Sequence, residues 1–225
     1  MVKQIKSITV PSFFWENFLN ESIPGSAENL DVASAQRTCD QARGIIERTN
    51  ERIRDISADP TATQPQKKIQ IERVAKQAKQ NLEKLINDAS ASLMDKTKSI
   101  NQEISSAIGN ADRIEKSVTM QKLNSMQVDK RSSFIRQLAA AGDFETLSHI
   151  VGRSAAFLEI DPAEFEEVKQ TYVQGAFPDK AKELATNGKL LNNYKKGILA
   201  VVNEFDSFGT ELTQKAEKAQ KALRE

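Results

Sequence analysis

Few residues in this sequence combine the side chains and the spacing that catalysis requires. His149 is the only histidine, and it stands between the apolar residues Leu147 and Ile150 in the stretch ETLSHIVGR. A general base works on a group within hydrogen-bond reach, and no nucleophile pattern surrounds this histidine. We therefore interpret His149 as a partly buried or surface residue of a helix.

The single cysteine is a second candidate for chemistry. Cys39 falls on an apolar position of a helical repeat, where a thiol behaves as a small hydrophobic group. A reactive cysteine needs exposure and a cationic neighbour. We expect Cys39 to be packed in a core, and one cysteine cannot form a disulfide within the chain.

Metal ligands are equally sparse. The one acidic run consists of Glu159, Asp161, Glu164, Glu166 and Glu167. It lacks the spacing of a calcium loop, and Pro162 begins a helix inside it, where acidic residues are favoured by the helix dipole. The glycines are scattered, so no phosphate-binding loop is present in the sequence. We expect no metal, no cofactor and no catalytic residue.

The balance of charge argues against nucleic acid as a partner. The chain has 32 basic and 31 acidic residues, a net charge of +1. Residues 66–98 carry eight Lys or Arg against four acids, but no aromatic residue lies among them to stack on bases. We interpret this stretch as the solvated face of a helix.

Aromatic residues are concentrated near the start of the chain. Four of the thirteen (ten Phe, two Tyr and one Trp) lie in the stretch VPSFFWENFLNESIPG. On a helix, Phe14, Trp15, Phe18 and Leu19 share one face, and Phe13 lies outside it. Either this segment folds back and caps a helical bundle, or it inserts into a groove of a partner, since Trp and Phe concentrate binding energy. The predicted partner-binding residues are Phe13, Phe14, Trp15, Phe18 and Leu19.

Insertion of the same segment into a membrane is a third interpretation. Its polar face offers Glu16, Asn17, Asn20 and Glu21 but neither Lys nor Arg. Anionic lipid prefers a basic face.

The elements that would position these residues are long helices. Residues 31–57 place apolar or small residues at alternating steps of three and four, which predicts a helix with one buried stripe. The stripe consists of Val32, Ala35, Cys39, Ala42, Ile46, Thr49, Ile53 and Ile56. A loop bounded by Pro60 and Pro65 follows, and its length suits an antiparallel pair of helices.

The next helix is predicted to run from residue 66 to about residue 126, roughly 60 residues and ~90 Å. Its stripe keeps the same rhythm except for one extra step of four near residues 89–97, a stutter. The predicted members are Ile71, Ala75, Ala78, Leu82, Leu85, Ala89, Leu93, Thr97, Ile100, Ile104, Ala107, Ala111, Ile114 and Val118.

Residues 127–188 predict short helices, with Asp143 as an N-cap and Asp161-Pro162-Ala-Glu164 as a helix start. Asn187-Gly188 is read as a stop. A last helix over 189–225 carries Leu191, Tyr194, Ile198, Val201, Phe205, Phe208, Leu212, Ala219 and Ala222 on its stripe, interrupted by Lys215. Near the start, Ile5, Ile8 and Val10 alternate weakly, which permits one short strand.

The predicted fold is all-α: an elongated antiparallel helical bundle, or coiled-coil hairpin, with a small helical knob and an N-terminal arm. The segments are the arm (1–27), the long hairpin (28–126), the small helical subdomain (127–188) and a C-terminal helix (189–225) that packs back on the hairpin.

The expected function is that of a non-enzymatic structural or assembly protein. It would multimerise through its helical stripes, as a homo-oligomer or a larger assembly, and dock through the aromatic segment. The class of protein that this chain fits best is a virion or assembly component of a bacteriophage, of the scaffolding or ejection type. One alternative is a membrane-interacting helical protein of the secretion-system or toxin type. The other is an enzyme with its site in residues 127–188.

Location is predicted from the absence of two signals. The longest apolar run, residues 198–202, is too short to span a bilayer. The start of the chain has no apolar core long enough for a secretory signal. We expect a soluble protein, in the cytoplasm or incorporated in a particle.

Overall fold

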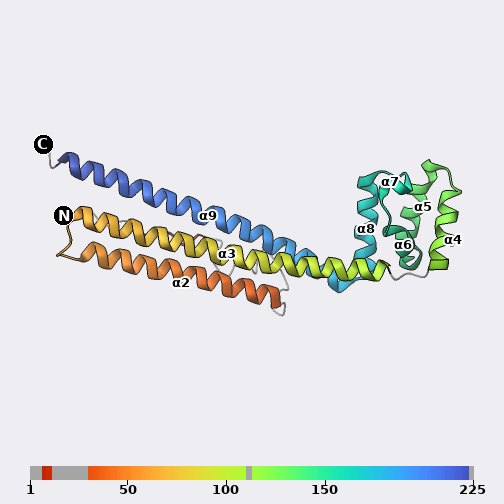
Figure 1. The fold of residues 1–225 in the computed structure, drawn as a ribbon, viewed down its shortest axis with the longest axis horizontal. Helices are drawn as coiled ribbons and strands as arrows, with labels where there is room; N and C mark the ends of the chain where they lie inside the picture. Colours follow the sequence, from red (N-terminus) through yellow and green to blue (C-terminus); the bar gives the residue numbers. More distant parts are fainter. Residues whose placement is uncertain (1–6, 12–29, 110–112, 223–225) are drawn as a thin grey trace. The chain divides into compact units, whose positions relative to one another are not determined.

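The structure is a computed structural model that describes residues 7–11, 30–109 and 113–222. Side chains are described in residues 7–11, 31–108 and 116–209. The fold is all-α, and no strand occurs in these ranges (Figure 1). Residues 7–11, which include Ile8 and Val10 of the expected strand, have no regular secondary structure. No helix among the described residues is both long and apolar enough to cross a membrane.

Among the described residues, three helices are long and five are short. The long ones are α2 (Leu30–Ala58), α3 (Gln64–Gly109) and α9 (Pro178–Ala222). The short ones are α4 (Arg113–Asn124), α5 (Val128–Ala141), α6 (Phe144–Val151), α7 (Ala155–Leu158) and α8 (Pro162–Ala176).

The predicted continuous helix from 66 to about 126 is wrong. Helix α3 ends at Gly109, and α4 begins at Arg113. Glycine weakens a helix because it has the largest backbone entropy to lose. Beyond the break the buried side is different: Val118, expected on the stripe, is 61% exposed, whereas Met120 and Leu123 are buried.

The predicted stop at Asn187-Gly188 is also wrong. Helix α9 begins at Pro178 and continues through both residues. Proline suits the first helical turn, and Asp179 beside it complements the helix dipole. Asn187 is completely buried, so packing outweighs the weak helix propensity of this pair.

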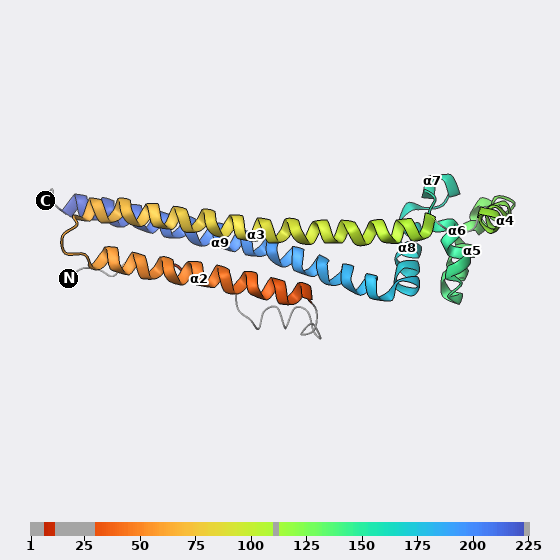
Figure 2. The same cartoon turned by 60° about the horizontal axis from the view of Figure 1, so that its bottom comes forward.

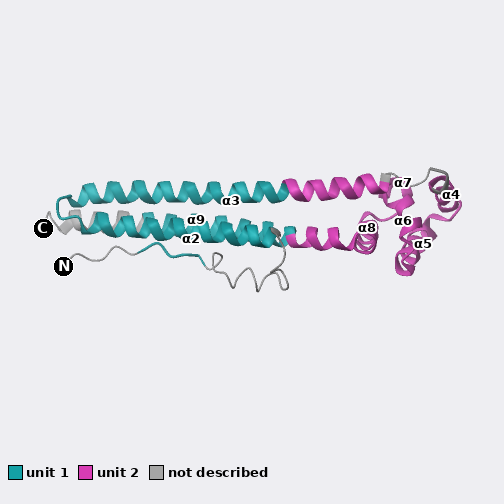
Figure 3. Cartoon of the chain, turned by 90° about the horizontal axis from the view of Figure 1, so that it is seen from below, with its two compact units in different colours: residues 1–94, 187–225 teal, residues 95–186 magenta. Residues whose placement is uncertain are grey.

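The described chain forms two compact units (Figure 3). Unit 1 comprises residues 1–94 and 187–225, and unit 2 comprises residues 95–186. The division into four segments stays a prediction, apart from the helix boundaries corrected above.

The core of unit 1 is built by α2, α3 and α9. In both views their segments in this unit lie side by side (Figures 1 and 2). The stripe predicted on α2 is confirmed from Val32 to Ile53, where each member is at most 5% exposed, and Ile56 is half-buried. The short residues Ala35, Cys39 and Ala42 are fully buried, which leaves room for a neighbouring helix to come close.

The stripe on α3 has a longer period than predicted. Its buried and half-buried residues recur every 11 positions, in the sets Ile71-Ala75-Ala78, Leu82-Ile86-Ala89, Leu93-Thr97-Ile100 and Ile104-Ile108. Ile86 holds the fully buried position beside Leu85, which is half-buried and packs against the same core, and Ile108 replaces the exposed Ala107. An 11-residue repeat differs from the heptad pattern by one extra step of four in every three turns of the helix. The stutter predicted near residues 89–97 is therefore one of several such steps that recur regularly along α3.

The core of unit 2 gathers side chains from α4, α5, α6, α7 and α8. The helix starts predicted at Asp143 and Asp161 are confirmed. Asp143 accepts a hydrogen bond from the Thr146 amide (3.1 Å), and Asp161 accepts from the amides of Ala163 (2.9 Å) and Glu164 (3.1 Å).

The packing of three aromatic rings in unit 2 requires a glycine on α8. The Tyr172 ring meets Phe144 and Phe177 edge to face, with centroids 6.3 and 5.9 Å away. A Cβ on Gly175 would lie 1.9 Å from Cζ of Phe144. Only glycine lets the Phe144 ring lie against α8.

Alanine at position 86 should be more damaging than alanine at 85. Ile86 is 0% exposed and Leu85 is half-buried. Ile86→Ala should lower the free energy of unfolding by about 2–5 kcal/mol, the usual cost of emptying a filled site. Leu85→Ala should cost less. Urea unfolding followed by circular dichroism measures both, and a larger loss for Leu85→Ala would contradict the 11-residue period.

Two glycines should respond oppositely to alanine. Gly175→Ala forces Phe144 to move and should destabilise by at least about 1–3 kcal/mol. Gly188, inside α9, has nothing within 4 Å of an added Cβ, so Gly188→Ala should stabilise by roughly 0.5–1 kcal/mol. The same unfolding experiment compares them, and a neutral Gly175→Ala would refute the Phe144 packing.

Candidate functional site

The five predicted partner-binding residues, Phe13, Phe14, Trp15, Phe18 and Leu19, lie outside the described residues. The structure does describe the chain immediately before them, residues 7–11, and the helix that follows, which begins at Leu30. The candidate site is therefore built from these two flanks and from the helices they contact.

Residues 7–11 are attached to unit 1 by a backbone tie. The Ile8 amide donates to Oδ1 of Asn50 (2.8 Å), and Nδ2 of Asn50 donates to the Ile8 carbonyl (2.8 Å). The Thr9 amide donates to Oε1 of Glu204 (2.7 Å). The Ile8 side chain is 2% exposed and belongs to the core of unit 1. We name these three hydrogen bonds and the buried Ile8 side chain the Ile8 tie.

Helical spacing explains where the tie forms. Asn50 lies four residues after Ile46 and three before Ile53, so it borders the buried stripe of α2. Glu204 lies three residues after Val201 and four before Phe208 on α9. Asn50 and Glu204 thus bring residues 8 and 9 into contact with both α2 and α9. The short strand permitted by the alternation of Ile8 and Val10 does not form in residues 7–11, and the backbone of Ile8 pairs with the carboxamide of Asn50.

Two asparagines of α9 are buried without full hydrogen bonding in the described part of the chain. Asn187 is 0% exposed, and neither its Nδ2 nor its Oδ1 has a partner there. Asn193 is 5% exposed, and its Nδ2 has none. A buried amide group without a partner costs about 1–3 kcal/mol. The sequence marks Asn187 only as part of a predicted helix stop, and it carries no signal at Asn193.

His149 is packed into the core of unit 2. It is 5% exposed on α6, and its Nδ1 lies 3.0 Å from Oγ1 of Thr119 on α4. Leu147 and Ile150, its apolar neighbours in sequence, are fully buried. The imidazole therefore links two helices of this core.

Cys39 is in the core of unit 1, as predicted, with 0% exposure. Burial raises the pKa of its thiol to about 11, and the nearby Asp40 carboxylate adds to the rise, against a smaller opposing effect of Arg43. A thiol of this kind is a poor nucleophile at neutral pH.

The acidic run of residues 159–167 is distributed over structural roles. Asp161 caps α8, Glu159 pairs with Arg131 (2.7 Å), and Glu166 pairs with Lys169 (2.8 Å). Glu164 accepts a hydrogen bond from Ser132 and lies 3.8 Å from Arg136. Among the described residues, no group of His, Cys, Asp or Glu is arranged to hold a metal ion.

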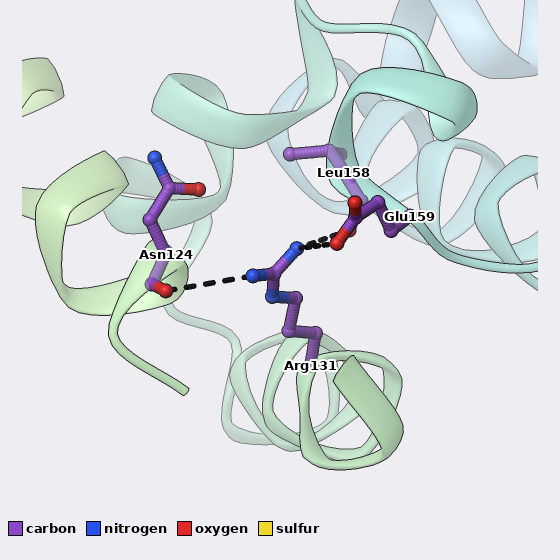
Figure 4. A network of polar contacts seen from close by, with 4 residues as sticks. All are labelled: Asn124, Arg131, Leu158 and Glu159. Atoms are coloured by element: carbon purple, nitrogen blue, oxygen red, sulfur yellow. Dashed lines mark hydrogen bonds and ion pairs between the residues drawn. The ribbon is translucent and has the colours of Figure 1, made fainter. Parts of the chain in front are cut away.

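A buried arginine links three parts of unit 2 (Figure 4). Nη1 of Arg131 donates to the Leu158 carbonyl (3.2 Å) and to Oε2 of Glu159 (2.7 Å), and Nη2 donates to the Asn124 carbonyl (3.4 Å). The bonds join α5 to the ends of α4 and α7. Glu159 follows α7 with a left-handed backbone (φ 55°), so the guanidinium holds a helix end in an unusual conformation. Arg131 therefore has a structural role, which is to connect helices of unit 2.

A groove of about 450 Å³ lies between α3 and α9 in unit 1. Its floor includes Ala75, Phe205 and Phe208, and its rim carries the Lys79–Asp206 ion pair (2.7 Å). The mixture of paired charges and aromatic floor suits a packing surface between helices better than a reaction site.

Burial of Cys39 has a measurable consequence. In the folded chain at pH 8 a thiol-specific reagent should fail to label it, and unfolding in denaturant should give complete labelling. Above about pH 9 the thiol ionises in the unfolded chain first, so the free energy of unfolding should decrease as pH rises from about 9 to 11. Cys39→Ala is the control and should show a smaller decrease. Rapid labelling of the folded chain would contradict the packing.

No protein-family model, no curated protein and no solved structure matches this chain. Its function must be inferred from its own residues.

Proposed function

We propose that the protein is a non-enzymatic structural or assembly protein that multimerises through its helical stripes and docks through the aromatic segment, residues 10–25. A virion or assembly component of a bacteriophage, of the scaffolding or ejection type, is the class we favour. The fold we propose for it is an elongated antiparallel bundle of coiled-coil type.

The antiparallel arrangement is supported by ion pairs in each unit taken separately. In unit 1, Lys79 of α3 pairs with Asp206 of α9. In unit 2, Lys96 pairs with Glu183 (2.7 Å) and Glu103 with Lys180 (2.6 Å), so residue numbers on α9 fall as those on α3 rise. The Lys180 ammonium also lowers the pKa of Glu103. The stripes with periods of 7 and 11 residues support helix pairing along their length.

One observation supports the proposal that the aromatic segment is an interface anchor. The chain is attached to unit 1 on both sides of this segment. The Ile8 tie holds the chain before it, and α2 begins a few residues after it, at Leu30. Large aromatic side chains concentrate binding energy at interfaces, and a segment held at both ends has less conformational entropy to lose on binding than a free tail.

The test uses variants that leave the Ile8 tie in place. Deleting residues 1–27 would also remove Ile8 from the core, so Phe14→Ser with Phe18→Ser is the sharper change. We expect wild type to form an oligomer of defined mass in light scattering and the double variant to have a lower mass. The control is Phe157→Ser, which removes a phenylalanine that is 56% exposed in unit 2 and should leave the mass unchanged.

Two outcomes would contradict the proposal. One is a wild-type chain that stays monomeric at every concentration. The other is an oligomer whose mass does not depend on Phe14 and Phe18. A blue shift of Trp15 fluorescence on adding anionic vesicles would instead favour a membrane-interacting protein.

A further inference from the structure

We propose that the groove between α3 and α9 of unit 1 receives α3 of a second copy of this chain, in an antiparallel contact with two-fold symmetry. The proposal rests on the proposed function, in which the chain assembles through its helices, and it names the surface where two copies meet.

The groove has the length and the open space that a helix needs. Its lining residues on α3 run from Glu72 to Glu83, about 16 Å along the helix. On the α9 side, a Cβ added to Gly209 would meet no described atom within 4 Å, so this wall of the groove is low. The floor residues Phe205 and Phe208 are nearly covered by the core already. Side chains of the rim would therefore make most of the contact.

The lining groups favour a protein surface over a small ligand. Sites for small molecules gather a few converging polar groups in an apolar pocket. Here the charges are spread along the rim, with two lysines and three acids: Lys76, Lys79, Glu72, Glu83 and Asp206. Lys68, one turn before Glu72 and 3.5 Å from it, balances the signs. A surface with balanced charge does not repel a copy of itself.

Four charged residues of α3 form a row along this face. Lys68, Glu72, Lys79 and Glu83 are separated by 4, 7 and 4 residues, so helical geometry places them on one side of the helix. The spacing is the same in both directions, but the signs alternate, so the row has the opposite sign at each position when it is reversed. The ion pair with Asp206 (2.7 Å) already holds the Lys79 side chain at the rim.

An antiparallel second copy therefore presents the opposite charge at every position of the row. When the two-fold axis passes between Ala75 and Lys76, Lys68 lies opposite Glu83 of the second copy. Glu72 then lies opposite Lys79 of the second copy, and the symmetry repeats both pairs. Ala75 is the shortest lining side chain on α3, which lets the two helices come close at the centre. Lys76 is exposed beside the axis, where its long side chain turns to water.

Other alignments of the two copies bring like charges together. A shift by one helical turn places Glu72 opposite Glu83 of the second copy and Lys76 opposite Lys79. A parallel copy in register places each charge opposite its own equivalent. Exposed ion pairs add little affinity, but like charges in contact are costly, so the row selects one alignment.

The experiment measures the mass of the full chain by light scattering over a range of concentrations. Glu83→Lys places a lysine opposite Lys68 at both ends of the contact and should weaken self-association at least about tenfold. Lys68→Glu should have the same effect, because it places a glutamate opposite Glu83. The control Lys84→Glu, at an exposed residue next to Glu83 and outside the groove, should leave the mass unchanged.

Mixing the two single variants separates a contact between copies from a change within one chain. Each contact between a Glu83→Lys chain and a Lys68→Glu chain joins opposite charges, so the mixture should associate although neither variant does so alone. A chain that carries both changes should also regain the association of wild type. Variants that had only lost stability would not rescue each other.

A disulfide tests the alignment directly. Glu72→Cys combined with Lys79→Cys places thiols opposite each other across the contact. Within one chain these positions are about 10.5 Å apart along the helix, which is too far for a disulfide. Oxidation should therefore give a covalent dimer on a non-reducing gel. Glu72→Cys with Lys84→Cys should give none, and the native Cys39 is fully buried.

Equal association of wild type, Glu83→Lys and Lys68→Glu would overturn the docking, and so would single variants that stay weak when mixed. The assembly function would still stand if the wild-type oligomer depended on Phe14 and Phe18. Conversely, association that depends on the charge row but not on Phe14 and Phe18 would support the docking and refute the aromatic anchor. A chain that stays monomeric at every concentration would refute both.

Discussion

The apolar stripe of α3 is the constraint on which the core of unit 1 depends. A repeat of 11 residues advances about 3.67 residues per turn, close to the 3.6 of an undistorted α-helix. A stripe with this period stays on one side of a nearly straight helix, whereas a strict heptad requires left-handed supercoiling. Ile71, Leu82 and Leu93 repeat this position in unit 1. One helix thus supplies an apolar side chain of the same orientation at each level.

Much of this arrangement could be predicted from periodicity. The stripe of α2 was identified residue by residue because one heptad pattern fits it without ambiguity. On α3 adjacent apolar pairs, such as Leu85 and Ile86, fit either rhythm, and only packing decides between them. The ends of α3 and α9 were missed for a similar reason. Local glycines and asparagines predict breaks, but the burial of Asn187 keeps α9 helical, and Gly109 coincides with the end of α3.

The candidate site was predictable only in part. Composition singled out the aromatic segment, but it could not reveal the Ile8 tie, because Asn50 and Glu204 are distant from Ile8 in sequence and their types are common on helix surfaces. The residues with reactive side chains had ordinary explanations that the structure supports. Cys39 and His149 pack in cores, and the acidic run caps a helix and pairs with cations.

The completely buried carboxamide of Asn187 affects more than stability. With an aliphatic side chain at this position, the observed alignment of α9 and an alignment shifted by one helical turn would be similar in energy, because successive apolar layers of the core resemble each other. A polar group at this position makes such shifted alignments unequal in energy, because each alignment places the carboxamide against different neighbours. The buried Asn187 therefore lowers the stability of the helix packing but favours one alignment of α9 over alignments shifted by a turn.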